Sequence, residues 1–565
     1  MPEHNDSPQI PSATPVSGFI DISTGLPAVH DTEVTLAREG GDLVVRALCR
    51  TDASGIPAAD RLVITFDPAG READTLQLAV APDGTCACSH LGTRFAGTAP
   101  AWSTEPYPFP AAVETTLADA GWRVTVRLPL LHMFAEVGGR VPEAFHLNVA
   151  RIWDNREWSY WPLADATFGE SVFAFARVRL TGTGVTVSAA PSSTPALPVT
   201  PPGAPLPFRG VMYDTSRAAK IYDVDTFVDF ADWLAVCGCT HFMLYFENGF
   251  RYRAHPDFAA PEALDADGVR RIADACRERG LELVLAQTTF GHMPGILRHP
   301  GYMHLAEDGN PYQICPGHPD TRRFLGELLD ELIPLSPSGY FNVNADESRV
   351  LGLCPRCRDR GRDALGKEQL FLEHLLWLHD KVRGHGRRMM VWSDHLLRMP
   401  SVLDGLPRDI VILDWQYYNW VAFPTLSYFR ERGFEVIGCP STRLDNIRTM
   451  TDQSRWRGAA GVLDTIWEAG DGGMALACPG IHLMGRIAGG DTTTPDEVLL
   501  AEAEERIWPG NPPGLAWKQL IDRNGSLTPV LSAKLRRDTA RALRRAVPAP
   551  RFAWIARQLL RLTGE

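Results

Sequence analysis

The chain has 565 residues, of which 45% are hydrophobic and 22% charged, as is typical of a folded protein with a sizeable core. Its formal net charge of -12 argues against a dedicated nucleic-acid-binding protein, because excess negative charge repels phosphates. No apolar run approaches the ~20 residues of a membrane-spanning helix, and Met1-Pro-Glu-His lacks the features of a secretory signal. With eleven scattered cysteines, the sequence predicts a cytoplasmic protein with reduced thiols and neither a nucleic-acid nor a membrane partner.

The N-terminal third is predicted to be all-β. We expect residues 1–16 to be a disordered N-terminus. Short runs of alternating polar and apolar residues, separated by turn signals, then predict an antiparallel β-sandwich over residues 17–182. The clearest runs are Asp42–Cys49, Arg61–Phe66, Trp122–Leu128 and Phe173–Leu180.

Aromatic residues in the second half of this sandwich carry a resemblance. The segments concerned are Trp122–Pro129, Phe145–Arg151, Trp158–Trp161 and Phe168-Gly169. They resemble family 9-like carbohydrate-binding modules, which implies a sandwich that binds sugar. The alternative is a structural sandwich, braced against the barrel, in which Trp153, Trp158 and Trp161 pack inside.

Residues 183–207 include Ala-Ala-Pro-Ser-Ser-Thr-Pro-Ala-Leu-Pro-Val-Thr-Pro-Pro-Gly-Ala-Pro. Such proline-rich composition cannot form a core, so the segment is predicted to be a semi-extended linker between two domains.

Beyond the linker, strand-like runs alternate with helix-like segments. The predicted strands are Gly210–Asp214, His241–Phe246, Leu281–Gln287, Tyr340–Val343, Arg388–Ser393, Ile410–Asp414, Phe434–Ile437 and Gly461–Ile466. Helix-like segments between them include Asp225–Val236, Ala266–Arg279, Thr321–Leu332 and Glu368–Arg383. Eight β/α units with near-continuous apolar strands predict an α/β fold, a (β/α)8 TIM barrel over residues 208–490.

The last part, residues 491–565, is predicted to be a helical extension with a basic surface. A helical cap on the barrel is one interpretation. A cap on a second subunit, which would make a homodimer, is another, and a helix that binds a membrane or an acidic partner is a third.

Acidic and aromatic residues follow the predicted barrel strands. Because the C-terminal ends of barrel strands converge on one site, we expect these side chains to lie together. They are Asp214, Glu247, His292, Asp346, Glu347, Trp392, Asp394, Trp415, Tyr417, Trp467 and Glu468. Polar groups that orient hydroxyls and rings that cover an apolar face predict a site for a sugar, in an oligosaccharide or a glycoconjugate.

The adjacent acids Asp346 and Glu347 are the most informative pair. Two carboxyl groups in different environments can divide into a proton donor and a charge stabiliser, which is the chemistry of glycosidic bond cleavage. The alternative is a solvated strand end that caps the next helix.

The motifs Gln287-Thr-Thr-Phe-Gly-His-Met293, Val391-Trp-Ser-Asp394 and Leu413-Asp-Trp-Gln-Tyr417 surround this pair in sequence. Over about Phe208 to Gly470 the chain resembles glycoside hydrolase family 20, the β-N-acetylhexosaminidases, and most closely its hexosaminidase D-like branch. The resemblance implies retaining, exo-acting hydrolysis in which the 2-acetamido oxygen of the substrate is the nucleophile.

The resemblance also implies roles for single residues. Glu347 would be the general acid and base, and Asp346 would accept the acetamido N–H. His292 would relay between Glu247 and Glu347, and Tyr417 would donate to the acetamido oxygen. Tryptophans 392, 415 and 467 would enclose the sugar, while Arg209 and Glu468 would bind its outer hydroxyls; Asp214 and Asp394 would also line the substrate site.

One departure concerns the segment just before the acid pair. Family members usually read His-x-Gly-Gly-Asp-Glu, whereas this chain reads Asn342-Val-Asn344-Ala345-Asp-Glu. An amide therefore replaces a small residue beside the acids. This leaves open a barrel glycosidase that acts on a sugar without an acetamido group, or a carbohydrate-binding protein without turnover.

Cysteines also flank the acid pair. Cys315-Pro-Gly-His318 precedes it and Cys354-Pro-Arg-Cys357 follows it, so Cys315, His318, Cys354 and Cys357 are candidate ligands of a structural zinc. Neither a P-loop nor a dinucleotide fingerprint is present, and we expect the reaction to require no cofactor.

Overall fold

The computed structural model describes two units of the chain. It covers all residues except 1–13, 17, 22–26, 53–54, 68–73, 95–100, 135–140, 155–156, 162–175, 182–183, 189–202, 217–218, 349, 362–363, 418–422, 424, 468, 471, 514–532 and 564–565. The change from one unit to the other falls inside the predicted linker.

The first unit contains two antiparallel sheets, which confirms the predicted all-β domain. One sheet has the order β1-β3-β4-β10-β9, and these strands are Thr14–Val16, Thr32–Glu39, Asp42–Arg50, Gly121–Pro129 and Ala112–Ala118. The other has the order β14-β13-β11-β5-β6-β7-β8, formed by Val185–Ser188, Ala176–Leu180, Ala144–Trp153, Arg61–Asp67, Asp74–Val80, Cys86–Arg94 and Ala101–Pro106. Strand β12 (Glu157–Trp161) pairs with β11, and β2 (Ile20–Asp21) pairs with β12.

Two predicted boundaries of this unit are wrong. Strand β1 pairs with β3 and buries Val16, so order begins within the residues predicted to be a disordered N-terminus. Strand β14 lies in the predicted linker, but it pairs with β13 and buries Val185 in the core. In both cases a short apolar strand gains a hydrogen-bonding partner, which outweighs a local composition rich in proline. Residues 1–13 and 189–202 lie outside the described residues.

Alternate residues of the two sheets form the core of the sandwich. A polar pair lies within this core. Arg151 donates to Asp60 (Nη2–Oδ2 2.9 Å), and Trp122 Nε1 donates to the same oxygen (2.7 Å). Both charged side chains are almost wholly buried, so each satisfies the other's hydrogen-bonding needs. Trp122 is therefore packed inside the sandwich.

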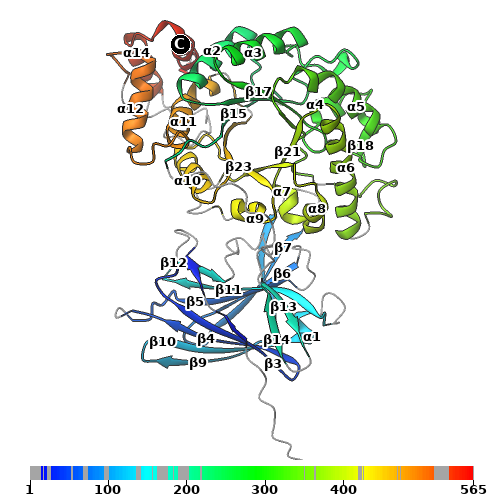
Figure 1. Ribbon diagram of the computed structural model, residues 1–565, viewed down its shortest axis with the longest axis vertical. Coiled ribbons are helices and arrows are strands. Elements are labelled where there is room, and N and C mark those ends of the chain that lie inside the picture. The colour runs from blue at the N-terminus through cyan, green and yellow to red at the C-terminus, as the bar shows by residue number, and fades with distance from the viewer. Residues whose placement is uncertain are drawn as a thin grey trace, which may run out of the picture. The chain divides into compact units, whose positions relative to one another are not determined.

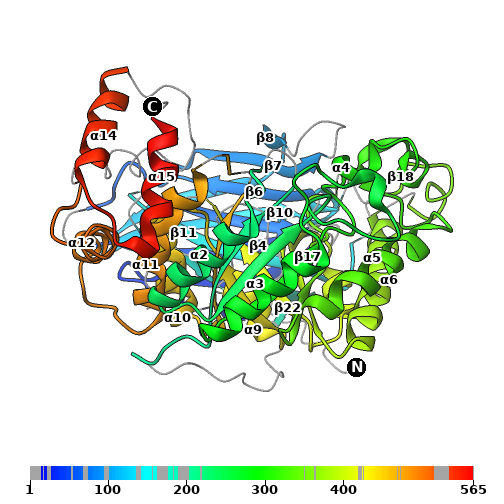
Figure 2. The same cartoon turned by 90° about the horizontal axis from the view of Figure 1, so that it is seen from above.

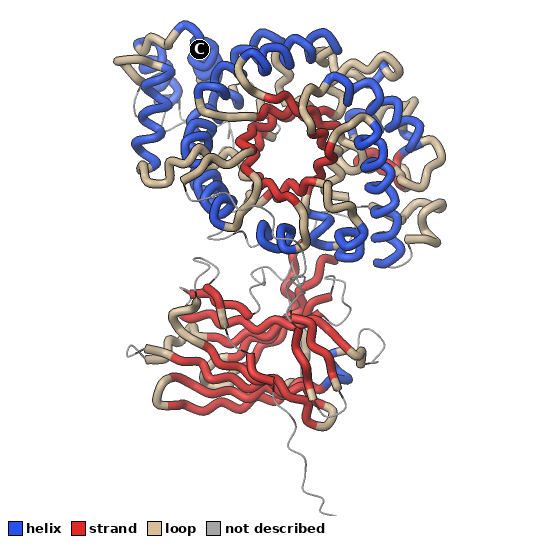
Figure 3. The backbone as a smooth tube through the Cα atoms, viewed as in Figure 1, coloured by secondary structure: helices blue, strands red, loops and turns tan. Residues whose placement is uncertain are grey.

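The second unit is a closed barrel of eight parallel strands, which confirms the predicted fold class. Its strands pair in the order β15-β16-β17-β20-β21-β22-β23-β24. They are Phe208–Asp214, His241–Phe246, Glu282–Gln287, Tyr340–Asn342, Arg388–Trp392, Val411–Trp415, Glu435–Cys439 and Gly461–Ile466. Figures 1 and 3 show the strands as a ring with helices outside it. Each strand lies within a residue or two of its predicted position.

Helices connect consecutive barrel strands. They are α2 (Val224–Val236), α3 (Ala266–Glu278), α4 (Pro294–Leu297), α5 (Thr321–Leu332), α6 (Ala364–Gly384), α7 (Asp394–Arg398), α8 (Pro400–Gly405), α9 (Thr425–Glu431) and α10 (Leu444–Trp456), while α11 (Gly473–Ala488) follows the last strand. Two of them begin at aspartates that cap the first turn. Asp223 accepts from Thr226 N and Asp265 from Gly268 N, each at 2.8 Å. A short hairpin of β18 (Ala306–Glu307) and β19 (Asn310–Ile314) is inserted between α4 and α5.

The C-terminal helices pack on the barrel. They are α12 (Asp496–Ile507), α14 (Ala533–Arg545) and α15 (Ala553–Leu562), and Figure 2 shows α14 and α15 beside α11 and α12. The ring of Trp554 on α15 lies 6.0 Å from that of Phe230 on α2, edge to face. The helical cap on the barrel is thus confirmed for the described part of this extension. None of the helices in the described ranges is long and apolar enough to cross a bilayer.

Candidate active site

The acid pair lies in the loop after β20, at the C-terminal end of the barrel. Asp346 is 6% exposed, whereas the side chain of Glu347 is 32% exposed. One carboxyl group is therefore held away from water and the other is open to it. Two carboxyl groups in such different environments can divide into a charge stabiliser and a proton donor.

The backbone of this loop is left-handed at three residues that carry side chains. Asn344 has φ 61°, Ala345 has φ 65° and Glu347 has φ 45°. Such conformations cost free energy for residues with a Cβ and gather at functional sites. The family pattern quoted above has glycines at the first two positions, and glycine adopts positive φ without strain.

Hydrogen bonds to Asn344 hold the loop in this conformation. Its Oδ1 accepts from Trp392 Nε1 (2.8 Å) and from Asn342 Nδ2 (3.0 Å). Its backbone N–H donates to Asn342 Oδ1 (2.8 Å). The Nδ2 of Asn344 is buried and has no hydrogen-bond partner among the described residues. The amide therefore anchors the loop and presents one further donor beside the acids.

His292 joins the two acids. Its Nε2 lies 3.3 Å from Asp346 Oδ2 and 3.0 Å from Glu347 Oε2. The preceding Gly291 allows this approach, because a Cβ there would lie 2.4 Å from the carbonyl oxygen of Asp346. His292 itself has φ 55°. The structure thus brings together the three residues that the sequence singled out most strongly.

Glu247 and Asp214 are buried at the ends of neighbouring strands. Glu247 Oε1 accepts from the backbone N–H of Gly295 and from that of Ile296 (3.3 Å), at the start of α4. Asp214 accepts from the backbone N–H (2.8 Å) and the hydroxyl (2.6 Å) of Ser216. Glu247 therefore holds the segment that follows His292, and Asp214 holds its own loop.

Aromatic residues from four strands form one connected cluster. Trp392 and Trp467 have ring centroids 5.6 Å apart, and Trp415 and Tyr417 have centroids 5.1 Å apart. Trp467 Nε1 donates to the hydroxyl of Tyr417 (2.5 Å), which links the two pairs. All four predicted ring residues thus lie together, with Tyr245 against Trp467 at 5.1 Å.

Tyr417 remains a hydroxyl at any physiological pH. Burial raises its pKa well above the usual range, and the charge of Asp346 adds to this effect. Trp467 Nε1 and Thr465 Oγ1 (3.1 Å) both donate to the phenol oxygen, so the hydroxyl proton of Tyr417 can be donated to another acceptor. The carboxylate of Asp346, whose charge acts on Tyr417, has a buried Oδ1 without a hydrogen-bond partner among the described residues. A donor and an acceptor are thus available together.

Three residues that the sequence did not single out, Tyr312, Gln313 and His395, complete the surroundings of Glu347 together with the predicted substrate residue Asp394. Tyr312 Oη lies 2.9 Å from His292 Nε2 and donates to Glu347 Oε2 (3.2 Å). Asp394 accepts from the backbone N–H of Glu347 (2.9 Å). His395 accepts from the backbone N–H of Ser348, and Gln313 accepts from its hydroxyl at 2.7 Å.

A sequence signal for Tyr312 and Gln313 exists. Asp308-Gly309 is the dipeptide typical of a two-residue hairpin, and both residues have positive φ, 51° and 71°. Recognising this hairpin would have predicted the short strand that carries both residues, but not its position beside the acid pair.

One predicted substrate residue, Arg209, does not belong to this cluster. Arg209 lies near the start of β15, and its guanidinium donates to the carbonyl oxygens of Gly238 (2.7 Å) and Leu206 (2.6 Å). At ~3.3 Å per residue, five residues of strand separate it from Asp214 by ~17 Å. Its prediction as a ligand of outer hydroxyls is therefore not supported by this arrangement. Glu468 lies outside the described residues.

The predicted zinc ligands need one correction. Cys315, Cys354 and Cys357 lie together, but their fourth neighbour is Glu307 rather than His318. His318 instead accepts from the backbone N–H of Asp320 (3.2 Å) and faces the ring of His304. Spacing within Cys-Pro-Gly-His suggested a ligand pair, whereas the fold turns the histidine away.

The geometry agrees with comparisons to known proteins. Residues 287–469 match the model of the glycosyl hydrolase family 20 catalytic domain. This range begins at the last residue of β17 and contains His292, both acids and the aromatic cluster. The match supports the prediction of a glycoside hydrolase domain in this part of the chain.

Curated relatives cover the same part. Hexosaminidase D of Homo sapiens is 24% identical over 191 residues, which is 32% of this chain and 39% of the relative. Hexosaminidase D of Bos taurus is 25% identical over 189 residues, covering 32% and 55%. The chain therefore spans less than two thirds of either relative. A solved chitobiase of Flavobacterium johnsoniae has a TM-score of 0.47 and 17% identity, over 61% of this chain and 56% of its own.

Proposed function

We propose that this chain is an exo-acting, retaining β-N-acetylhexosaminidase that removes terminal, non-reducing GlcNAc or GalNAc with the help of the substrate's own acetamido group. One observation carries the proposal: a buried carboxylate with an oxygen left for a donor, Asp346, lies next to a partly exposed carboxyl group, Glu347. The family 20 match over these residues supports the same chemistry. The substrate would be an oligosaccharide or a glycoconjugate.

In the proposed reaction the acetamido oxygen attacks the anomeric carbon and forms an oxazolinium ion. Asp346 Oδ1 accepts the acetamido N–H, which orients the group and stabilises its developing positive charge. Tyr417 donates its hydroxyl proton to the acetamido oxygen, and its raised pKa keeps that proton in place. No nucleophilic side chain is needed, which departs from the usual pair of carboxylates.

Glu347 would protonate the leaving oxygen and later take a proton from water. This cycle needs a group that can share a proton with it, and His292 Nε2 lies 3.0 Å from its carboxyl oxygen. Tyr312 and Asp394 fix the side chain and the backbone of Glu347. Glu247 acts one step further away, because it holds the turn that carries His292.

The aromatic cluster would enclose the acetamido group and the apolar face of the sugar ring. Trp392 and Trp467 are close enough to form adjoining walls, and Trp415 has a buried Nε1 without a hydrogen-bond partner among the described residues. That N–H suits a sugar oxygen. Rings of this kind select a pyranose while the acids select the acetamido group.

Asn344 favours a second candidate, a barrel glycosidase for a sugar without the acetamido group. Its buried Nδ2 is a donor beside the acids where relatives have only glycine. A donor at this place suits a hydroxyl or carbonyl oxygen on the sugar. In that enzyme Asp346 would have another function, since its N–H partner would be missing.

The hexosaminidase D-like branch and sugar binding by the sandwich are further proposals, which rest on the motifs quoted above. A cytoplasmic location and a homodimer stay predictions from the sequence. None of them is needed for the reaction at the barrel.

A panel of 4-nitrophenyl β-glycosides tests the proposal. It contains β-GlcNAc, β-GalNAc, β-glucoside and β-galactoside, with wild type and Glu347→Gln compared on each. Turnover confined to the two acetamido sugars, and lost in the variant, supports the proposal. Turnover of a sugar without the acetamido group supports the second candidate. Undiminished activity of Glu347→Gln would contradict the assignment of Glu347 as the general acid.

A further inference from the structure

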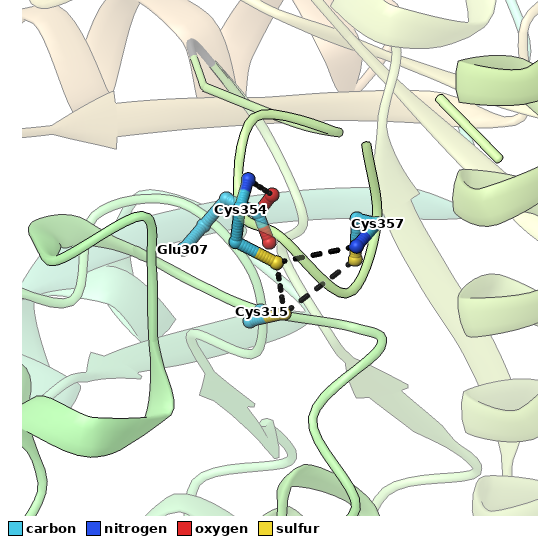
Figure 4. Close-up of side chains that lie close together, drawn as sticks. All are labelled: Glu307, Cys315, Cys354 and Cys357. Carbon is cyan, nitrogen blue, oxygen red and sulfur yellow. Dashed lines mark hydrogen bonds between the residues drawn. The ribbon is translucent and has the colours of Figure 1, made fainter. Parts of the chain in front are cut away.

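Three cysteines and one glutamate form a compact, buried cluster beside the acid loop. They are Glu307 at the end of β18, Cys315 just after β19, and Cys354 and Cys357 in the segment that follows the acid pair (Figure 4). All four side chains are buried. Their four candidate ligand atoms lie within 4.8 Å of one another.

The sulfur positions suit one small metal ion. Cys315 Sγ lies 3.5 Å from Cys354 Sγ and 3.6 Å from Cys357 Sγ. Two thiolates on a tetrahedral zinc, each with a Zn–S bond of ~2.3 Å, are about 3.8 Å apart. A disulfide needs the two sulfurs at ~2.0 Å, and it would leave the third cysteine and the carboxylate unused. The spacing therefore matches a shared ion better than a bond between two of the sulfurs.

The backbone around the sulfurs is shaped for such an ion. A Cβ on Gly317 would lie 2.6 Å from Cys357 Sγ, so the chain after Cys315 passes closely over the cluster. The backbone N–H of Cys357 donates to Cys354 Sγ (3.4 Å). N–H groups directed at sulfur stabilise thiolates and orient them toward a metal.

Charge gives an independent reason for a cation. Glu307 is fully buried; its Oε1 accepts from the backbone N–H of Cys354 (2.9 Å), and its Oε2 has no hydrogen-bond partner among the described residues. A buried carboxylate beside three thiols is costly unless a cation compensates it. Within the described ranges, no lysine, arginine or histidine forms an ion pair with Glu307 at 4.0 Å or less.

We propose that Glu307, Cys315, Cys354 and Cys357 bind one zinc ion. Three soft thiolates and one carboxylate in a closed, four-ligand arrangement favour zinc over harder or more highly coordinated ions. Because all four positions are filled by side chains, this zinc is structural. His318 takes no part in it.

The ion would fix the surroundings of the acid pair. It ties the β18–β19 hairpin to the segment after Glu347. That hairpin carries Tyr312, which contacts Glu347 and His292, and Gln313, which accepts from Ser348 and from Val350 N (3.1 Å). The zinc site thus acts on the acid through positioning, at one remove from the substrate.

The test begins with the metal content of the full-length protein, purified with a thiol reductant from zinc-supplemented cells. We expect about one zinc per chain by mass spectrometry. Replacement by cobalt should give thiolate-to-cobalt charge-transfer absorption and the d–d bands of a tetrahedral ion. These readouts are independent of the proposed glycosidase activity, so either idea can fail alone.

Variants assign the ligands. Cys354→Ser and Glu307→Gln should lower zinc occupancy several-fold, and Glu307→Gln keeps the size of the side chain. His318→Ala and Cys86→Ser, the latter at an exposed cysteine, should retain it. Wild type that holds no zinc and takes up neither zinc nor cobalt, or a disulfide among the three cysteines in reduced preparations, overturns the proposal. Loss of zinc in His318→Ala overturns the ligand set, and the wild-type measurement stands even if a variant fails to fold.

Discussion

Replacing Asp346 by asparagine is the most direct perturbation of the proposed mechanism. The substitution preserves the size of the side chain and removes one negative charge. Asp346 Oδ2 lies 3.3 Å from His292, while Oδ1 is left for the acetamido N–H. With that hydrogen bond formed, the positive charge of the oxazolinium would lie ~4 Å from the carboxylate.

Coulomb's law then gives the size of the effect. Two unit charges ~4 Å apart interact by about 4 kcal/mol at an effective dielectric constant of ~20. At 1.36 kcal/mol per tenfold change in rate, kcat should fall by about 10³ in Asp346→Asn. KM should change much less, because the neutral ground state lacks the charge that Asp346 stabilises.

The assay compares kcat and KM of the two forms on 4-nitrophenyl β-GlcNAc. Asp394→Asn is the matched control: Asp394 is buried to a similar degree, at 8% exposed, and accepts from the backbone N–H of Glu347, which an amide oxygen can also do. We expect the control to lose about tenfold or less. A loss below tenfold in Asp346→Asn, or an equal loss in both variants, would refute the charge-stabilising function of Asp346.

Three further predictions concern the surrounding structure. Tyr417→Phe removes the donor to the acetamido oxygen and the acceptor of Trp467 Nε1, so kcat should fall about 10- to 100-fold in the same assay. Asn344→Ala should lower the free energy of unfolding of the barrel by roughly 3 kcal/mol in denaturant titrations, because Trp392 Nε1 loses its acceptor. Asn344→Gly should lower it by about 1 kcal/mol less, since glycine adopts φ 61° without strain. Equal losses in the two variants would show that the backbone at residue 344 is not strained. Burial lowers the pKa of His374 to about 4. In the unfolded chain His374 is protonated below about pH 6.5, whereas in the folded protein it stays neutral down to about pH 4. The free energy of unfolding should therefore fall by up to about 3 kcal/mol between pH 6.5 and 4. In His374→Gln the melting temperature of the barrel, by calorimetry, should depend less steeply on pH.

The barrel could be predicted closely because its strands are continuous apolar runs. A strand such as β16, His241–Phe246, is buried at every residue, so the apolar run in the sequence has the same bounds as the strand in the structure. The helices between the strands have amphipathic faces and caps, which also are local. Prediction failed at Thr14–Val16 and Val185–Ser188, because short strands depend on partners far away in the chain.

The site was predicted in part for a similar reason. The C-terminal ends of barrel strands converge, so residues such as Trp392 and Trp415 could be placed without knowledge of the loops. Arg209, at the start of its strand, could not be placed in this way. Tyr312 and Glu307 lie on a hairpin inserted between strands, and no rule of the barrel predicts where such an insertion folds back.

The loop before the acids shows how a substitution in the sequence can be understood from backbone geometry. Positions 344 and 345 have positive φ, which glycine adopts without strain, so the side chains of Asn344 and Ala345 are unexpected there. Asparagine tolerates this conformation better than most residues, and here its Oδ1 also receives two hydrogen bonds that compensate the strain. The same bonds fix the orientation of the amide, and therefore the position of its Nδ2. A residue that first stands out as a departure from the family pattern is therefore both a support for the acid loop and the feature on which sugar selectivity should depend.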